Sequence, residues 1–198
     1  MLIKKNWTYK LLIKLLYVKS KKFNNIPNKN SNFDIKLYLI GLSFNRFIFN
    51  LDKIIFMLCI ITNFLLFLNL NKNNILFIGN PEHKDFIKKY ALASNQKYYE
   101  NFLLPGTFSG IEPASLYYKS LGKNQIFKDI DCVISLSCKH HNQFLVEIFK
   151  NCIPIISLIN EKNSITKLIT YPIFIVDNSK YVYFFMQYFC KILNHNKC

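Results

Sequence analysis

Residues 75–81 read Ile-Leu-Phe-Ile-Gly-Asn-Pro, and this stretch decides the fold that the sequence predicts. Four consecutive apolar residues are typical of a strand that is buried on both faces. Gly79 ends the run, Asn80 is a good helix N-cap, and Pro81 suits the first turn of a helix. The stretch therefore predicts a buried strand followed at once by a helix that runs to about Ala93.

The same alternation of short apolar strands and helices continues to the end of the chain. One helix that ends near Asn151 and another over Ser179–Leu193 follow later strands. This alternation predicts an α/β fold: a mainly parallel sheet of about five strands with helices on both faces, in a flavodoxin-like arrangement. Besides Ile75–Ile78, the strands are expected at Tyr98–Tyr99, Cys132–Leu136, Ile153–Ile159 and Pro172–Val176.

Upstream of this pattern, Ile54–Leu70 is an almost continuous apolar segment with lysines near both ends. As a helix it would be about 25 Å long, which is shorter than the bilayer hydrocarbon core of about 30 Å. Its polar residues, together with Asp52, recur near helical spacing and form a narrow polar stripe, as on a helix packed against a sheet. We therefore interpret the segment as a helix that covers the sheet, with a membrane span as the alternative. The polar residues are Thr62, Asn63 and Asn69.

The charge of the chain is strongly positive. It has 26 basic and 11 acidic residues, a net charge of +15 and a pI near 9.5. Arg46 is the one arginine among many lysines, and Asn, Ile, Phe and Tyr are also abundant; lysine and these four residues have A/T-rich codons. Such a bias inflates the lysine count but does not explain the scarcity of acids. The excess charge favours a polyanionic partner, with nucleic acid ahead of an anionic membrane surface.

Basic residues are dense at the N-terminus, where residues 1–33 hold eight lysines and no acid. Four leucines within residues 11–16 form a short helical stripe flanked by lysines. We interpret residues 1–33 as a basic arm that lies on RNA, and residues 34–198 as a single α/β domain. A targeting segment or an amphipathic surface helix is the other interpretation of the arm.

Motifs that would indicate an enzyme or a cofactor site are missing from the sequence. It has neither a G-x-G-x-x-G nor a G-x-x-x-x-G-K-[ST] motif, and 11 acids leave little for acid–base chemistry. Cys138, His140 and His141 form the densest group of metal-capable residues, but adjacent histidines do not easily face one ion. The chain is therefore predicted not to be an enzyme and to hold no cofactor or metal.

None of the six cysteines forms a C-x-x-C pair, so the spacings of zinc knuckles and redox sites are absent. Four of them have apolar sequence neighbours and are predicted to be small core residues in a reducing compartment. These four are Cys59, Cys132, Cys152 and Cys190.

The order of several short segments resembles that of ribosomal protein S-two of the small subunit, in its bacterial and organellar form. The family has a Tyr-Ile-x-Gly segment, a stretch that ends in Asp-Leu-x-Lys, a long helix, an Ile-Leu-Phe-Val-Gly strand, and a Tyr-x-Asn segment before a Gly-Thr turn. The corresponding residues here are Tyr38–Gly41, Ile48–Lys53, the apolar stretch 54–70, Ile75–Gly79, Tyr99–Asn101, and Gly106 with Thr107.

The C-terminal half resembles the family most closely. The family has a strand that opens with Asp, then a helix, a Gly-Ile-Pro-Val strand start, and a Tyr-Pro-Ile-x-x-x-Asp segment before its last helix. The matches follow one another in the family's order across residues 38–192, which makes the resemblance more specific than any single match. The C-terminal matches are Asp131–Ile134, Glu147 within the helix, Cys152–Ile155, and Tyr171–Ile173 with Asp177.

Two features of the family are absent from this chain. The family's N-terminal motif, which joins Gly-His to Trp-Asn-Pro, is not recognisable in residues 15–36. The family's long charged coiled-coil hairpin would follow the Gly-Thr turn, where only about twenty residues, 111–130, precede the Asp-led strand. Twenty helical residues span about 30 Å in total and cannot form two long helices. We therefore expect an α/β domain without the coiled-coil insertion.

The resemblance implies a structural role without catalytic residues. The chain is expected to be a constituent of the small subunit of an organellar ribosome, in the mitochondrial matrix or, as the alternative, in a plastid. Its partners would be small-subunit rRNA and neighbouring ribosomal proteins, and its lysines would neutralise phosphates without reading bases. The rival hypothesis is a small membrane-anchored organelle protein that spans the bilayer at Ile54–Leu70. The candidate rRNA-binding residues are Lys4, Lys5, Lys10, Lys14, Lys19, Lys21, Lys22, Lys29, Lys36, Arg46, Lys88 and Lys89.

Overall fold

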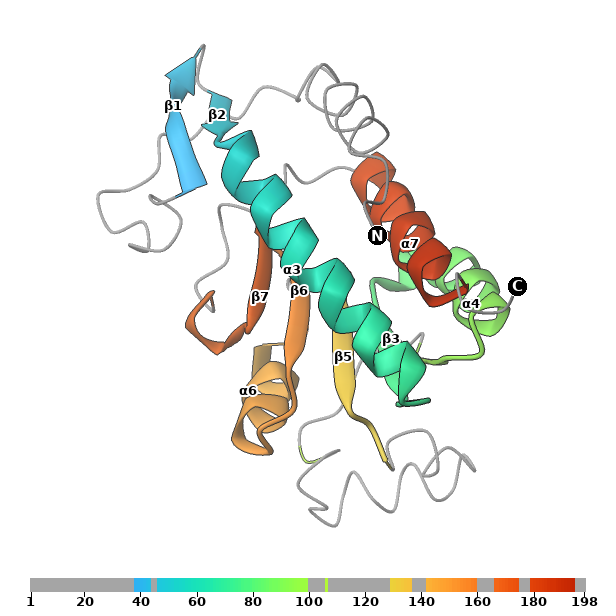
Figure 1. The fold of residues 1–198 in the computed structure, drawn as a ribbon. Helices are drawn as coiled ribbons and strands as arrows, with labels where there is room; N and C mark the ends of the chain where they lie inside the picture. Colours follow the sequence, from blue (N-terminus) through green and yellow to red (C-terminus); the bar gives the residue numbers. More distant parts are fainter. Residues whose placement is uncertain are drawn as a thin grey trace.

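The computed structural model describes residues 38–43, 46–99, 106, 129–136, 142–159, 166–174 and 179–194. Its main element is a five-stranded sheet in the order β4-β3-β5-β6-β7, in which every neighbouring pair of strands is parallel. This confirms the predicted α/β, flavodoxin-like fold (Figure 1). The strands are β3 (Ile75–Ile78), β4 (Lys97–Tyr99), β5 (Cys132–Ser135), β6 (Ile155–Ile159) and β7 (Tyr171–Phe174).

Every residue of the three central strands β3, β5 and β6 is buried, because helices cover both faces of the sheet. The parallel register aligns Ile75 with Cys132, so apolar side chains run in rows across the strands. Ser135 and Ser157 lie opposite each other in adjacent strands, and the Ser157 hydroxyl donates to the Ser135 carbonyl oxygen at 3.3 Å. This hydrogen bond satisfies a hydroxyl that would otherwise be costly to bury.

The connections between strands place helices on opposite faces of the sheet. From β3 the chain continues to β4 on one side, and from β5 it continues to β6 on the other, so right-handed crossovers put α4 and α6 on opposite faces. α7 packs against α4 and α3, and α3 also packs against β7. Figure 1 shows α3 running diagonally across the sheet, with α7 and α4 to its right in this view. The helices are α3 (Leu51–Leu70), α4 (Lys84–Ala93), α6 (Asn142–Lys150) and α7 (Ser179–Asn194), with short 3₁₀ turns at η1 (Pro81–His83) and η3 (Thr166–Leu168).

The turn after β3 follows the predicted pattern with one difference. Pro81 opens η1 and α4 ends at Ala93, as expected. Asn80 occupies the N-cap position, but its side chain makes no capping hydrogen bond, and its buried Oδ1 has no hydrogen-bond partner within the described residues. The turn between β3 and α4 therefore depends on Gly79 and Pro81 rather than on a side-chain cap.

Gly79 allows α4 to pack close to β3. A Cβ atom at this position would lie 2.2 Å from Cδ1 of Ile87, a fully buried residue of α4. We expect Gly79→Ala to lower the free energy of unfolding by about 1–3 kcal/mol, because Ile87 must move within a closely packed core. Urea denaturation measures this change.

Ile87→Val is the matched control, because it removes the Cδ1 atom that the new Cβ would meet. Alone, Ile87→Val should lower the free energy of unfolding by about 0.5–1.5 kcal/mol. In an Ile87→Val background, Gly79→Ala should lower the free energy of unfolding much less than it does in the wild-type protein. Strictly additive costs would show that the contact with Ile87 is not the reason for glycine at this position.

Two short strands at residues 39–43 and 46–49 form a pair that the sequence pattern did not indicate. β1 (Leu39–Ser43) and β2 (Arg46–Phe49) pair antiparallel as a separate two-stranded sheet. The backbone N–H of Asn50 donates to the carbonyl oxygen of Tyr38 at 2.7 Å and so joins the two ends of this strand pair. The Asn50 side chain then caps α3, since its Oδ1 accepts from two backbone N–H groups of the first turn.

α3 has a buried face and an exposed face, and both are largely apolar. The buried face packs on the sheet and on α7, and it consists of Ile54, Leu58, Ile61, Thr62, Leu65 and Leu68. On the opposite side Phe56, Ile60, Phe67 and Leu70 are 67%, 37%, 59% and 69% exposed. These four residues and the exposed Asn63 are termed the outer face of α3.

The predicted polar stripe on this helix is wrong at Thr62, which lies on the buried face. The Thr62 hydroxyl donates to the carbonyl oxygen of Leu58 at 2.6 Å. Because a hydroxyl has a single hydrogen, the Tyr188 hydroxyl of α7 donates to Thr62 Oγ1, also at 2.6 Å. Asp52 and Asn63 are exposed, as expected, but the other residues of the outer face are apolar.

Within the described part of the chain, α3 is the one helix that is long and apolar enough to cross a membrane, over Asp52–Leu70. Of the most apolar 18-residue window, 33% is buried inside the fold. A bilayer-spanning α3 would have to give up its packing on the sheet and the hydrogen bond between Thr62 and Tyr188.

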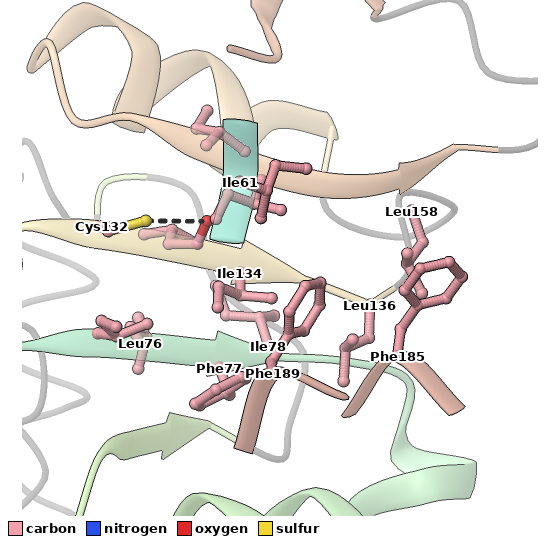
Figure 2. Packing of buried hydrophobic residues seen from close by; sticks show 14 of the residues in the cluster. Ile61, Leu76, Phe77, Ile78, Cys132, Ile134, Leu136, Leu158, Phe185 and Phe189 are labelled. Carbon is pink, nitrogen blue, oxygen red and sulfur yellow. Dashed lines mark hydrogen bonds between the residues drawn. The ribbon is translucent and has the colours of Figure 1, made fainter. Parts of the chain in front are cut away.

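The hydrophobic core joins the sheet to α7. Phe185 and Phe189 of α7 are almost completely buried. Figure 2 shows their side chains reaching into the cluster formed by the strands, near Ile78, Ile134 and Leu136. The core therefore fixes α7 on the sheet, and α7 in turn positions the side chains that it presents to solvent.

Candidate nucleic-acid interface

Three of the twelve predicted RNA-binding residues fall within the described residues, namely Arg46, Lys88 and Lys89. The nine lysines from Lys4 to Lys36 lie outside them. Arg46 opens β2, opposite Ser43 of β1. Figure 1 places this strand pair and α4 well apart on the molecule, so the structure does not bring Arg46 together with Lys88 and Lys89.

α4 presents a basic surface to solvent. Lys84, Lys88 and Lys89 are exposed, while Ile87 and Ala91 of the same helix are buried. Lys84 and Lys88 are four residues apart and therefore share one side of the helix. The Lys88 ammonium lies 6.0 Å from the ring centre of Tyr98 in β4, which is at the outer range of a cation–π contact.

Aromatic side chains fill the seam between α4 and α7. The Phe86 and Tyr183 rings meet in a T-shaped contact with centroids 4.1 Å apart. His83 lies 5.6 Å from Tyr183, and Tyr90 lies 4.5 Å from Phe86, again between ring centroids. The Gln187 side-chain amide donates to the Tyr90 hydroxyl at 3.1 Å. Although these contacts hold the cluster, Tyr183 remains 39% exposed.

The exposed lysines of α4 and α7 and the aromatic cluster at the seam lie on the same two helices and are together termed the α4–α7 surface, although Lys84 and Lys88 project from a side of α4 other than the one that meets α7. Lys180 is exposed and precedes Tyr183 by three residues, so both lie on the same side of α7. Glu82 and Asp85 are the acidic residues nearby, in the first turns of η1 and α4, where the helix dipole favours negative charge. The surface comprises His83, Lys84, Phe86, Lys88, Lys89, Tyr90, Lys180 and Tyr183.

The chemistry of the α4–α7 surface suits a nucleic acid. Lysine ammonium groups bind phosphates through charge, and aromatic rings offer flat faces to bases. Sequence reasoning identified only Lys88 and Lys89 of this set. The spacing of Lys84 from Lys88, and of Lys180 from Tyr183, was the available signal, but it does not reveal that α4 and α7 pack side by side.

Two carboxylates that could have been considered for catalysis instead hold backbone segments. Asp131 Oδ2 accepts from the backbone N–H of Asn74 at 2.8 Å, and the Asn74 carbonyl oxygen accepts from the Asp131 N–H at 3.0 Å. Glu147 Oε1 on α6 accepts from the N–H of Gly106, a buried residue with a φ of 91° that favours glycine. Asp131 thus ties the start of β5 to the start of β3, and Glu147 fixes Gly106 against α6.

The cysteine prediction is correct for two residues and wrong for two. Cys132 and Cys190 are buried, as expected, whereas Cys59 and Cys152 are exposed. Cys59 lies beside the outer face of α3, and Cys152 has a φ of 56° in the turn after α6. Apolar sequence neighbours did not guarantee burial, because successive residues of helices and turns point in different directions.

Burial makes the two core thiols hard to ionise. It raises the pKa of Cys132 above its ordinary value, and the neighbouring Asp131 carboxylate adds to the effect. Burial also raises the pKa of Cys190 to about 11, although a hydrogen bond with Ser94 partly opposes this. Because these pKa values exceed the ordinary value of 9.0, the folded protein retains both protons where the unfolded chain releases them.

The free energy of unfolding should therefore fall as the pH rises above about 9, and the share from Cys190 should be lost between pH 9 and about 11. Urea denaturation at several pH values across this range measures the slope of the free energy of unfolding against pH. Cys190→Ala should reduce the slope, because it removes the thiol whose pKa burial raises. Equal slopes for the wild type and Cys190→Ala would contradict the assignment of part of this pH dependence to the Cys190 thiol.

The described residues contain no group of three or more His, Cys, Asp or Glu side chains that could hold a metal ion. The predicted group of Cys138, His140 and His141 lies outside those residues. Comparison with known proteins supplies no relative, since no protein-family model and no curated protein matches the chain.

Proposed function

We propose that this protein is a structural constituent of the small subunit of an organellar ribosome, in the manner of ribosomal protein S-two. The proposed location is the mitochondrial matrix, with a plastid as the alternative. In this role the protein binds the rRNA backbone, contacts neighbouring ribosomal proteins and catalyses no reaction.

The observation that carries the proposal is where the segments of the resemblance lie in the fold. Gly106 of the Gly-Thr turn and Glu147 of the later helix are 41 residues apart, yet a hydrogen bond joins them. Four other segments lie at strands of one parallel sheet, which supports reading them as a single family pattern, while Tyr38–Gly41 and Ile48–Lys53 lie at the separate β1–β2 pair and the start of α3. Ile75–Gly79 contains β3, Asp131–Ile134 leads into β5, Cys152–Ile155 leads into β6, and Tyr171–Ile173 opens β7.

The charge of the chain supports RNA as the partner. A net charge of +15 creates a strong attraction for a phosphate backbone. The four lysines of the α4–α7 surface are exposed and lie on two helices that pack against each other. In the proposed role they neutralise phosphates without reading base edges, as a protein that binds folded rRNA by shape would.

The outer face of α3 supports contacts with neighbouring proteins. Its four large apolar side chains, between 37% and 69% exposed, follow one side of a single helix. Contiguous apolar patches of this kind mark interaction sites in folded proteins. In the proposed assembly, an adjacent ribosomal protein covers this face.

The membrane-anchored alternative draws on the same helix, because α3 has the length and the hydropathy of a span. The buried face of α3 favours the ribosomal proposal, since Ile61 and Leu65 are fully buried in the fold. The ribosomal proposal requires the buried face of α3 to stay packed in the fold, whereas the membrane-anchored alternative requires it to face lipid. Substitutions on the two faces of α3 therefore distinguish the two proposals.

Ultraviolet crosslinking tests whether small-subunit rRNA is the partner of this protein. A tagged chain is crosslinked in the cells that produce it and purified under denaturing conditions, and its covalently bound RNA is sequenced. The proposal predicts strong enrichment of organellar small-subunit rRNA over large-subunit rRNA and messenger RNA. RNA recovery no higher than from an untagged strain, or enrichment of another RNA class, would contradict it.

A further inference from the structure

The exposed ring of Tyr183 is surrounded by groups that fix it and by groups that carry charge. Phe86 and His83 contact it at centroid distances of 4.1 and 5.6 Å, yet 39% of the side chain remains open. Lys180 lies three residues earlier on α7 and therefore shares a side of that helix with Tyr183. A held aromatic ring beside a cation is more than phosphate binding requires, because phosphate contacts need charge alone.

We infer that the α4–α7 surface binds a single-stranded segment of RNA, with an unpaired base stacked on Tyr183 and the adjoining phosphate bound by Lys180. The inference rests on the proposed function and deepens it, because it adds a site for a base to a protein expected to contact only the backbone.

The geometry favours an unpaired base over a helix. In a duplex, each base already stacks on its neighbours, so its flat face is not available to a side chain. Unpaired bases in loops and bulges stack on exposed aromatic rings, with little preference for sequence. Tyr183 is pre-ordered for this contact by Phe86, so little side-chain entropy is lost when a base binds.

The charge around Tyr183 favours RNA over a protein partner. The cores of protein–protein interfaces are depleted of lysine, whereas four lysines belong to the α4–α7 surface. An apolar partner would have to desolvate these ammonium groups, whereas a strand of RNA places a phosphate near them. The acidic residues Glu82 and Asp85 lie in the first turns of η1 and α4 and are outnumbered by the four lysines.

The test measures binding of the full chain to two fluorescent RNAs by anisotropy, one a twelve-nucleotide uridine strand and the other a closed duplex of similar charge. Tyr183→Ala should weaken binding to the single strand by about five- to a hundredfold. It should leave the slope of log K against log salt unchanged and affect duplex binding by less than about twofold. Tyr183→Phe, which keeps the ring, should bind as the wild type does.

A lysine variant separates stacking from charge. Lys180→Gln should reduce the steepness of the salt dependence by about 0.7, because each single-strand phosphate contact contributes about 0.7. Phe149→Ala is the matched control, since Phe149 is a 50% exposed aromatic residue of α6, outside the α4–α7 surface. If Tyr183→Ala lowers the melting temperature, Tyr183→Leu replaces it, because leucine keeps an apolar contact with Phe86 but has no ring.

Two results would overturn the inference. Unchanged binding by Tyr183→Ala would show that no base stacks there, and an equal loss in Tyr183→Phe would assign the contact to the hydroxyl. In both cases the chain still binds RNA, so the proposed function stands. Failure of the wild-type chain to bind either RNA at 50 mM salt would overturn the proposed function together with the inference. If anisotropy instead showed saturable binding of an acidic peptide to the same face, with RNA unable to compete, the partner would be a protein.

Discussion

Leu65→Lys is expected to abolish cooperative unfolding of this protein, whereas Phe67→Lys should leave it folded. Leu65 is fully buried on the inner side of α3, and an ammonium group placed there has no partner and no water. Burial of an uncompensated charge costs about 4 kcal/mol or more, which is a large part of the total stability of a domain. Phe67 is 59% exposed on the outer face, so lysine there should change stability by about 0.5 kcal/mol or less.

Circular dichroism and urea denaturation of the purified variants measure this contrast. The two sites are two residues apart on one helix, so helix propensity and sequence context are nearly matched. In a bilayer-spanning helix, positions 65 and 67 lie at nearly the same depth, so lysine should have a similar effect on either face. Equal loss of folding in both variants, or recovery of both only with detergent, would therefore support the membrane-anchored alternative.

Removing three charges from α4 should weaken RNA binding by about fiftyfold. Each neutralised single-strand phosphate contributes about 0.7 to the salt exponent, so three contacts contribute about 2.1 and are worth roughly fiftyfold at 0.15 M salt. The variant carries glutamine at Lys84, Lys88 and Lys89, all exposed, so its stability should be close to that of the wild type. Anisotropy titrations with a small-subunit rRNA fragment over a range of salt concentrations give both the affinity and the slope.

A second triple variant controls for net charge. Lys72, Lys150 and Lys167 are also exposed, but they lie after α3, at the end of α6 and in η3, away from the α4–α7 surface. Their replacement by glutamine removes the same charge and should change affinity by less than about threefold. Equal losses in the two triple variants would show that the chain attracts RNA through its total charge and not through α4.

The strand and helix order could be predicted because the signals are local. Four consecutive apolar residues identify β3, and β5 and β6 are short apolar runs with a single serine each. The apolar spacing of α7 places its start at Ser179, as observed. Their parallel pairing follows from the alternation with helices. The β1–β2 pair was missed because residues 38–49 contain neither a turn dipeptide such as Asn-Gly nor a clear alternation of apolar and polar residues.

The features that the sequence did not reveal depend on contacts between distant residues. Thr62 was expected to face water, but its partner Tyr188 lies 126 residues further along the chain. The aromatic cluster is equally non-local, since His83 and Phe86 meet Tyr183 only after α4 and α7 pack together. Charge alone pointed to Lys88 and Lys89, but the aromatic cluster between α4 and α7 could be found only from the fold.

Sedimentation of the intact assembly tests the central claim most directly. Organelle lysate is run on sucrose gradients at moderate and high salt, with and without ribonuclease, and the chain is detected across the fractions. The account predicts that the protein migrates with small-subunit rRNA and moves to the top of the gradient after ribonuclease treatment. Migration with membranes regardless of ribonuclease, and release only by detergent, would contradict it and would identify α3 as a membrane anchor.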